Sequence, residues 1–588
     1  MLTRTSFRFS PTGRYAACLA ADRPGAWQLE TWLLDPPVPP RRVEQPRPNG
    51  PRAQVLPMDD GRILLCQPTD AEREHEILLA GADGRAHSLG TITADGLRLL
   101  EHPNPQILAV AVASFRNQTT TLSLVRAEDP YIRPSLTLEG LVGGGTWLDG
   151  TGRWLALNRA QNKKVSAIAV NLRTRSVTPL WPEDRGLRLL FATPDIRVVA
   201  DAQHRVGWCR PGGEPSWPAG LEDARRLWPL AADPWSRRIA FRVDDGSTSR
   251  LAILIPGLDQ LSYVRLPAGT LGATASWTEA GLRVPFAGQL HVPGIAEVRP
   301  GSAQPFRMLH GLRPAGGPGG GGPQLERFEG PSGPVDAVVY GDWRTAPKVL
   351  VALHGGPDAA WQLQPDQMLT ELAGLGLAVV AVNPTGSRGS GSIAGAWGGP
   401  DLADVRAVAS TLAARRGPLL LLGTSYGAYL ALLTLGADPE LWSRGAVLAP
   451  FLSGPRLYLD ARPRVRALLD RLGGRSLYQD ALGPRDALHF ADQIRVPVLI
   501  VHGARDDVIP ASHSRELYAR LTPRHFGVRY LELADAGHDL LTGPSAGQVL
   551  EVLRAFLADS REPREMATTN LLTPPRVPAA AGAMREGR

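Results

Sequence analysis

The sequence predicts two large domains of different fold class, an all-β domain in the first half and an α/β domain in the second. Up to about residue 305, helical periodicity is scarce, and short apolar runs alternate with turn residues, as in all-β proteins. After a Gly- and Pro-rich stretch at 310–323, strand-like and helix-like segments alternate. A chain of 588 residues is long enough for two domains that each bury a substantial core.

The composition is that of an ordinary globular protein, with 43% hydrophobic and 21% charged residues. The formal charge of +7 is carried almost entirely by arginines scattered among acidic residues, so we expect no nucleic-acid partner. No apolar run could span a membrane, and arginines interrupt the N-terminus where a signal peptide would be apolar. We therefore expect a cytoplasmic protein with no membrane partner. The separated Cys18, Cys66 and Cys209 match no metal or disulfide motif and indicate buried thiols.

A weak element recurs through residues 1–309, at intervals of roughly 40–45 residues, which is the length of a four-stranded propeller blade. It consists of an apolar or aromatic residue, a polar turn and a strand, as in Phe9–Ala16 and Trp147–Leu155. About seven such units predict a β-propeller of about seven blades. A pair of β-sandwiches is the alternative interpretation. The other units lie at 58–64, 103–112, 194–199, 234–240 and 277–284.

Residues 324–560 form the predicted α/β domain. The segments on either side of it, 310–323 and 561–588, are predicted to have little structure. The Gly- and Pro-rich segment 310–323 is typical of a linker. Residues 561–588 are polar with several prolines, which indicates a disordered tail. The expected strands are Val335–Tyr340, Val349–Leu353, Ala378–Val382, Leu419–Leu422, Gly445–Leu448, Val498–Val501 and Val528–Leu533, and the expected helices are Gln367–Leu375, Leu402–Arg415 and Gly547–Ala558.

One stretch of the α/β domain predicts a nucleophile. The apolar strand Leu419–Leu422 is followed at once by Gly-Thr-Ser-Tyr-Gly at 423–427 and then by an apolar helix. This order places Ser425 at the apex of a sharp strand-to-helix turn, where flanking glycines avoid collision with the backbone. The Gly-x-Ser-x-Gly pattern occurs again at 543–547, but no strand precedes it and Pro544 adjoins its serine. The context therefore selects Ser425.

A serine hydroxyl needs a base within hydrogen-bond reach, and the base needs an acid that orients it. On an α/β-hydrolase sheet the acid and then the base follow the nucleophile, in loops after later strands. Two later strands lead to Asp506 and to His538, so we expect Asp506 to orient His538 as the base for Ser425. His502 is the alternative base, and Asp507 is the alternative acid.

The oxyanion that forms during acyl transfer needs at least two hydrogen-bond donors. The amide of Tyr426 follows the nucleophile and is one candidate. The strand Val349–Leu353 leads directly into His-Gly-Gly-Pro at 354–357, where glycines let the backbone approach a substrate closely. We expect the Gly356 amide to be the second donor; a simple Gly-Gly turn is the alternative.

Six short motifs stand in one order across about residues 325–558: His354–Pro357, Asn383–Gly389, Trp397-Gly398 with Asp401, Gly423–Ala428, His502–Asp506 and Gly537-His538. On these motifs, the second half resembles the prolyl oligopeptidase family of serine peptidases, especially its acylaminoacyl-peptidase-like branch. The resemblance implies a propeller in front of the catalytic domain, in agreement with the pattern of the first half. It also implies an opening that admits peptides and excludes folded proteins.

Departures from the family pattern narrow the expectation. The dipeptidyl branch captures the substrate amine with adjacent glutamates, and no Glu-Glu pair occurs here, so that activity is disfavoured. Prolyl oligopeptidase itself has a tyrosine at the place of His354, which favours the acylaminoacyl-like branch. Ala428 replaces the family's last glycine and is a tolerated small residue. The long Gly-rich linker leaves the coupling of the two domains open.

We therefore expect a serine peptidase that hydrolyses short peptides or acyl-peptides through an acyl-enzyme, without a metal or organic cofactor. Oligopeptidase, acylaminoacyl-peptidase and aminopeptidase modes all fit the sequence. An esterase or transacylase with the same triad is the first alternative, and a propeller binding protein with an inert hydrolase half is the second. Sheet edges in this family often pair, so a homo-oligomer stays open.

Overall fold

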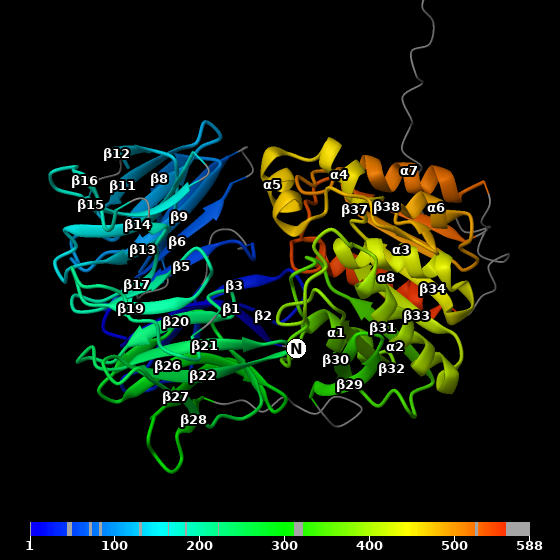
Figure 1. The fold of residues 1–588 in the computed structure, drawn as a ribbon, viewed down its shortest axis with the longest axis horizontal. Coiled ribbons are helices and arrows are strands. Elements are labelled where there is room, and N and C mark those ends of the chain that lie inside the picture. The colour runs from blue at the N-terminus through cyan, green and yellow to red at the C-terminus, as the bar shows by residue number, and fades with distance from the viewer. Residues whose placement is uncertain are drawn as a thin grey trace, which may run out of the picture.

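The computed structural model of the protein describes residues 2–43, 50–69, 73–81, 85–128, 132–162, 164–182, 185–221, 223–310, 322–523 and 527–559. An all-β domain and an α/β domain lie side by side (Figure 1). The predicted linker at 310–323 lies almost wholly outside the described residues, and the predicted tail at 561–588 lies entirely outside them.

The described part of the all-β domain consists of seven antiparallel sheets, each formed by consecutive strands, which confirms the predicted β-propeller. Five sheets have four strands, the fifth along the chain has three, and the last has five. The first four blades are β1 (Thr3–Phe9), β2 (Tyr15–Ala21), β3 (Trp27–Leu33), β4 (Arg41–Val43); β5 (Gln54–Pro57), β6 (Ile63–Pro68), β7 (Glu74–Ala80), β8 (Ala86–Thr93); β9 (Gly96–Glu101), β10 (Ala109–Ser114), β11 (Thr119–Val125), β12 (Pro134–Glu139); and β13 (Leu141–Trp147), β14 (Trp154–Gln161), β15 (Lys164–Asn171), β16 (Val177–Pro179). The last three are β17 (Arg188–Ala192), β18 (Arg197–Ala200), β19 (Val206–Cys209); β20 (Leu227–Ala232), β21 (Ile239–Asp245), β22 (Thr248–Ile255), β23 (Gln260–Val264); and β24 (Gly269–Leu271), β25 (Ser276–Thr278), β26 (Gly281–Gly288), β27 (His291–Val298), β28 (Phe306–Leu309).

The element that recurs in the sequence is a turn that enters the second long strand of a blade. Phe9–Ala16 joins β1 to β2, and Trp147–Leu155 joins β13 to β14. In at least three blades an aspartate in this turn accepts backbone hydrogen bonds, as Asp60 does from the amide of Arg62 over 3.0 Å. Asp149 accepts from the amide of Trp154 over 3.0 Å, and Asp233 accepts from the amide of Arg238 over 3.0 Å. The recurring polar positions therefore have a backbone-capping role.

Side chains, rather than a shared strand, close the ring in the described part of the chain, because the first blade is built only from β1–β4. Arg283 of the last blade donates to the carbonyl of Gly13 over 2.9 Å. Thr274 donates to the carbonyl of Phe7 over 2.8 Å. The first and last blades are thus joined by hydrogen bonds between loops and strand backbones.

The α/β domain is built on an eight-stranded sheet with the order β29-β30-β32-β31-β33-β34-β37-β38. From β32 to β38 neighbouring strands are parallel, and β29 and β30 add an antiparallel edge. The strands are β29 (Gln324–Gly330), β30 (Gly333–Tyr340), β31 (Lys348–Leu353), β32 (Leu377–Asn383), β33 (Leu419–Thr424), β34 (Trp442–Leu448), β37 (Val498–Gly503) and β38 (Val528–Leu533), with a separate small pair β35 (Gln479–Asp480) and β36 (Gly483–Pro484). The order, with β31 and β33 near the centre, is that of the predicted α/β-hydrolase fold.

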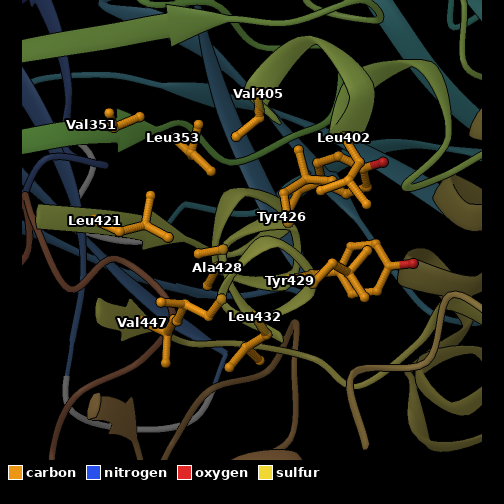
Figure 2. Packing of buried hydrophobic residues seen from close by; sticks show 14 of the residues in the cluster. Val351, Leu353, Leu402, Val405, Leu421, Tyr426, Ala428, Tyr429, Leu432 and Val447 are labelled. Atoms are coloured by element: carbon orange, nitrogen blue, oxygen red, sulfur yellow. The ribbon is translucent and has the colours of Figure 1, made fainter. Parts of the chain in front are cut away.

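Helices cover both faces of this sheet, so its central strands, such as β32 and β33, are continuous apolar runs. The helices are α1 (Gln367–Ala373), α2 (Pro400–Arg416), α3 (Tyr426–Ala437), α4 (Gly454–Asp460), α5 (Pro463–Leu472), α6 (Ala487–Ala491), α7 (Ser512–Leu521) and α8 (Ala546–Ala558), with a short 3-10 helix at Pro439–Leu441. On one face α2 to α7 pack against the sheet, and on the other face α1 and α8 do. Figure 2 shows part of the first of these cores, where Tyr426 of α3 lies beside Leu402 of α2, and Ala428 of α3 lies near the strand residues Leu421 and Val447.

The propeller contacts the α/β domain through the hairpin between β21 and β22. The carbonyl of Ser247 accepts a hydrogen bond from the amide of Leu363 over 2.7 Å, and the Ser247 hydroxyl accepts one from the side-chain amide of Asn383 over 2.8 Å. Arg388 lies 3.7 Å from the carboxylate of Asp244. These contacts hold the loops that follow β31 and β32.

A second set of contacts joins the first two blades to the segment after β38. Trp27 donates through its indole nitrogen to the carbonyl of Thr542 over 2.7 Å. Arg52 forms an ion pair with Asp539 over 2.8 Å. None of the helices in the described part of the chain has the length and apolar character needed to cross a membrane.

Candidate active site

The turn between β33 and α3 holds Ser425 in a conformation that few non-glycine residues adopt. Its φ is 54° and its ψ is −117°, which places the residue in a strained region. A Cβ atom on Gly423 would lie 2.3 Å from the carbonyl oxygen of Gly427, and one on Gly427 would lie 2.4 Å from that of Leu353. Only glycine fits at either position, so the sharp turn that exposes the hydroxyl depends on both.

The structure brings the three predicted residues of the triad together. His538 Nε2 lies 3.1 Å from Ser425 Oγ, and His538 Nδ1 lies 2.7 Å from Asp506 Oδ2. Asp506 stands after β37 and His538 after β38, at the carboxyl end of the parallel sheet where Ser425 also lies. With Nδ1–H donating to Asp506, the lone pair of Nε2 faces the Ser425 hydroxyl, which is the geometry of a general base.

The environment of Asp506 keeps its carboxylate ionised. Burial raises its pKa, but hydrogen bonds from His502, His538 and the Ile509 amide outweigh burial and hold the pKa well below its usual range. Oδ1 accepts from the amides of Val508 and Ile509 over 2.8 and 2.9 Å. An ionised, fixed carboxylate can both orient the His538 ring and stabilise its protonated form.

Neither the alternative acid, Asp507, nor the alternative base, His502, takes the place of its rival in the hydrogen-bond chain from Ser425. Asp507 is exposed and lies 3.8 Å from Arg462. His502 is fully buried. Its Nδ1 forms a hydrogen bond of 2.6 Å with the Ser514 hydroxyl, and its Nε2 lies 2.9 Å from the Ile509 carbonyl. His502 therefore supports the Asp506 loop and does not face the nucleophile.

The two predicted oxyanion donors are the amides of Tyr426, which follows Ser425, and of Gly356, in the loop after β31. Tyr426 is the first residue of α3, so its amide is among the free N–H groups at the positive end of that helix. The loop after β31 passes directly beside the nucleophile, because a Cβ on Gly355 would lie 3.2 Å from the Ser425 Cβ. Gly356 has a φ of +109°, which only glycine adopts readily. Donation from the Gly356 amide to an oxyanion stays a prediction.

His354 holds the loop after β31 in place through two hydrogen bonds. Its Nε2 lies 2.8 Å from the hydroxyl of Ser387, and its Nδ1 lies 2.7 Å from the carbonyl of Gly355. Burial lowers the pKa of His354 to about 4, so the ring is neutral at physiological pH. A neutral ring that joins the loops after β31 and β32 has a structural role beside the nucleophile.

Sequence reasoning assigned no role to the contact between Tyr426 and Asp401. The Tyr426 hydroxyl donates to Asp401 Oδ2 over 2.5 Å, and both side chains are buried. Burial raises the pKa of Asp401 to about 6. Asp401 lies in the first turn of α2, where an acidic residue is expected anyway as a partner of the helix dipole. Its position alone therefore could not distinguish a contact with the nucleophile turn from an ordinary helix start.

A family model matches the domain that holds this site. Residues 363–562 match the model of the prolyl oligopeptidase family. The catalytic domain belongs to the prolyl oligopeptidase family. The matched region includes Ser425, Asp506 and His538.

Two curated proteins illustrate the similarity of the chain to known proteins. This chain is 28% identical over 207 residues to dipeptidyl peptidase family member 6 of Caenorhabditis elegans. The aligned region covers 32% of this chain and 28% of the relative. The chain is 28% identical over 219 residues to the acylamino-acid-releasing enzyme of Sus scrofa, with 34% of this chain and 29% of the relative covered. The chain thus spans less than a third of the length of either relative.

Solved structures are similar over nearly the whole chain. A puromycin hydrolase has a TM-score of 0.72 at 19% identity, with 95% of this chain and 94% of the other covered. An acylaminoacyl peptidase of Pyrococcus horikoshii has a TM-score of 0.72 at 13% identity, with 95% of each chain covered. At these identities the similarity establishes the two-domain fold.

Proposed function

We propose that this protein is a serine peptidase that hydrolyses amide bonds in short peptides or N-acylated peptides. The observation that carries the proposal is the Ser425–His538–Asp506 hydrogen-bond chain, with distances of 3.1 and 2.7 Å, beside a glycine loop and a helix N-terminus. The membership of the catalytic domain in the prolyl oligopeptidase family supports the same chemistry.

The first half-reaction forms an acyl-enzyme. The Ser425 Oγ attacks the substrate carbonyl carbon while its proton passes to His538 Nε2. The negative charge that develops on the carbonyl oxygen is stabilised by the Tyr426 amide and, as we predict, the Gly356 amide. His538 then gives its proton to the leaving nitrogen, and the C–N bond breaks. Asp506 stays ionised throughout and holds the imidazole in place.

The second half-reaction releases the acyl group. A water molecule gives a proton to His538 Nε2 as its oxygen attacks the ester carbonyl of acylated Ser425. A second tetrahedral intermediate uses the same amide donors. When it collapses, the proton returns from His538 to the Ser425 oxygen, and the product acid leaves.

The substrate class is supported by two independent features. Propeller contacts at Ser247 and Asp539 hold the loops beside the triad, so the all-β domain borders the approach to Ser425 and favours small or extended substrates over folded proteins. No adjacent glutamates that could capture a free substrate amine occur in the sequence, which favours an acyl-peptide or an internal bond over a dipeptidyl mode.

A direct test compares substrates and variants in parallel. An N-acetyl-aminoacyl p-nitroanilide should be hydrolysed by the wild-type protein and not by Ser425→Ala or His538→Ala. Ser545→Ala, which changes the serine of the second Gly-x-Ser-x-Gly pattern, serves as the matched control and should retain activity. Amide hydrolysis that survives Ser425→Ala would contradict the proposal.

An esterase with the same triad is the second candidate, because a serine nucleophile also attacks esters. Matched p-nitrophenyl esters and p-nitroanilides of the same acyl group separate the two activities. We expect measurable turnover of both. Ester hydrolysis with no amide hydrolysis, across several acyl groups, would favour the esterase.

A further inference from the structure

A cavity of about 380 Å³ lies where the propeller faces the catalytic domain. Arg4 and Arg8 of β1 and Arg242 of β21 contribute to its walls from the propeller. Gln362 and Gln364, from the loop between β31 and α1, line it from the catalytic domain. A space walled by three guanidinium groups and several neutral polar groups is suited to an anionic ligand.

Two of the three arginines are already neutralised. Arg4 forms an ion pair with Glu30 over 2.6 Å, and both side chains are buried. Arg242 lies 2.8 Å from Asp244, which is also buried. Arg8 differs, because no hydrogen bond or ion pair joins its guanidinium to another residue in the described part of the chain. The unpaired charge that lines the cavity therefore belongs to Arg8.

Neighbouring charges do not compensate Arg8 fully. Burial, and then repulsion from the charge of Arg8, lowers the pKa of Arg98, whose Nη2 is buried without a hydrogen-bond partner among the described residues. Glu101 attracts Arg8 electrostatically. Burial, with help from Asp59, raises the pKa of Glu101 to about 7, so this carboxyl is only partly ionised at neutral pH. Arg8 and Arg98 together therefore carry more positive charge than Glu101 balances, and an anionic ligand can supply the missing negative charge.

The cavity is within reach of a peptide bound at the nucleophile. Gly355 lies against Ser425, and Gln362, which lines the cavity, follows it by seven residues. A chain of that length spans about 25 Å at most. A substrate that extends from Ser425 toward the propeller therefore needs no more than about seven residues to bring a terminal group into the cavity.

We propose that this cavity binds a carboxylate of the peptide substrate and that Arg8 is the residue that anchors it. A planar guanidinium can donate two parallel hydrogen bonds to one carboxylate, which a neutral end group cannot accept in the same way. The inference rests on the proposed peptidase function, and it makes Arg8 a specificity-determining residue for short peptides with a free C-terminal carboxylate. An acidic side chain near the end of the peptide supplies the same chemistry.

Binding to the full-length Ser425→Ala protein tests the inference without turnover. The probes are N-acetylated alanine-based peptides of four, six and eight residues, each prepared as the free acid and as the C-terminal amide. A third form carries a glutamate at the last position before the amide. Isothermal titration calorimetry gives the dissociation constants. We expect at least one length to bind at least tenfold more tightly as the free acid than as the amide, with the preference weakened by added salt.

Variants assign the preference to Arg8. In Ser425→Ala/Arg8→Met the ratio of the dissociation constants of amide and free acid should fall below twofold. Arg8→Lys in the same background should retain part of the preference, because the positive charge stays but the two parallel hydrogen bonds of the guanidinium are lost. Arg173→Met, at an exposed arginine in the turn after β15, is the matched control and should keep the full ratio. A thermal unfolding curve for each variant shows that it is folded. Tight binding of the glutamate amide would identify a side-chain carboxylate as the ligand, and tight binding of the free acid alone would identify the C-terminus.

The outcome separates this inference from the function on which it rests. Equal binding of free acid and amide at every length, or no binding of any peptide, would overturn the inference. A preference that survives Arg8→Met would overturn the role of Arg8. If the wild-type protein hydrolyses an acyl p-nitroanilide, which has no C-terminal carboxylate, the peptidase proposal stands whichever result the binding gives. If it hydrolyses none, a free-acid preference that depends on Arg8 would still establish the anion site.

Discussion

The Tyr426 hydroxyl donates a hydrogen bond to Asp401 Oδ2 over 2.5 Å, and this contact joins the first residue of α3 to the first turn of α2. Both the backbone and the side chain of Tyr426 therefore have a part in the site. Its backbone amide is a predicted oxyanion donor, and its side chain is held in the buried core of the domain (Figure 2). Because the residue directly follows Ser425, the contact also fixes the strained nucleophile turn.

We predict that Tyr426→Phe lowers both stability and catalysis. The change leaves the buried Asp401 carboxyl without its hydroxyl donor, which costs about 1–3 kcal/mol. A small shift of the Tyr426 amide should reduce kcat about tenfold, less than the complete loss of an oxyanion donor. Tyr429→Phe is the control, because it removes a similar buried hydrogen bond, 2.8 Å to the Arg485 carbonyl, one helical turn away. Equal kcat values for the two variants would contradict a positioning role.

Asp401 also predicts a pH dependence of stability. Burial raises its pKa to about 6, above the ordinary value of 3.8. A carboxyl with a raised pKa in the folded state stabilises the fold below about pH 4, and this contribution is lost as the pH rises through 6. Relative to wild type, Asp401→Asn should therefore gain unfolding temperature between pH 4.5 and pH 7.5. Thermal unfolding at both pH values measures this gain, and Asp535→Asn at an exposed carboxylate should show none.

The two adjacent aspartates after β37 should differ sharply. Asp506→Asn removes the charge that orients His538 and should lower kcat by about 10⁴-fold. Asp507→Asn changes an exposed residue 3.8 Å from Arg462 and should alter kcat less than twofold. Steady-state kinetics of the two variants on one p-nitroanilide measures the difference. A larger loss at Asp507 would reassign the acid of the triad.

The loop beside the nucleophile leaves no room for a side chain. In Gly355→Ala the new methyl group would lie 3.2 Å from the Ser425 Cβ, closer than most real contacts. We expect kcat to fall about 10- to 100-fold, because a misplaced loop shifts the substrate carbonyl relative to its donors. Gly150→Ala in a propeller turn meets no atom within 4 Å and should leave kcat at the wild-type value. Full activity of Gly355→Ala would show that the loop does not border the substrate.

Local patterns in the sequence predict the blades and most of the central sheet. The turns at Asp149 and Asp233 recur because backbone hydrogen bonds to an aspartate are a short-range feature. Apolar runs such as Leu419–Thr424 are detectable because both faces of the strand are buried. No local pattern predicts the edge strand Gln324–Gly330, because its polar residues are partly exposed and its place depends on pairing with β30.

In the candidate site, too, features set by local sequence can be predicted, and contacts between distant segments cannot. Ser425, Asp506 and His538 could be predicted because each follows an apolar strand whose end is fixed by the sheet. The contact of Tyr426 with Asp401 could not, because it depends on how α2 packs against α3. The hydrogen bond between Ser247 and Asn383 joins residues 136 positions apart and depends on the docking of two domains. No local pattern encodes such contacts.

Covalent labelling of Ser425 tests the central claim most directly. A fluorophosphonate probe reacts with a serine that a neighbouring base activates, and digestion followed by mass spectrometry locates the modified residue. The wild-type protein should carry one probe on Ser425, and both Ser425→Ala and His538→Ala should carry none. A folded wild-type protein that takes up no probe, or takes it up at another serine, would contradict the assignment of this triad.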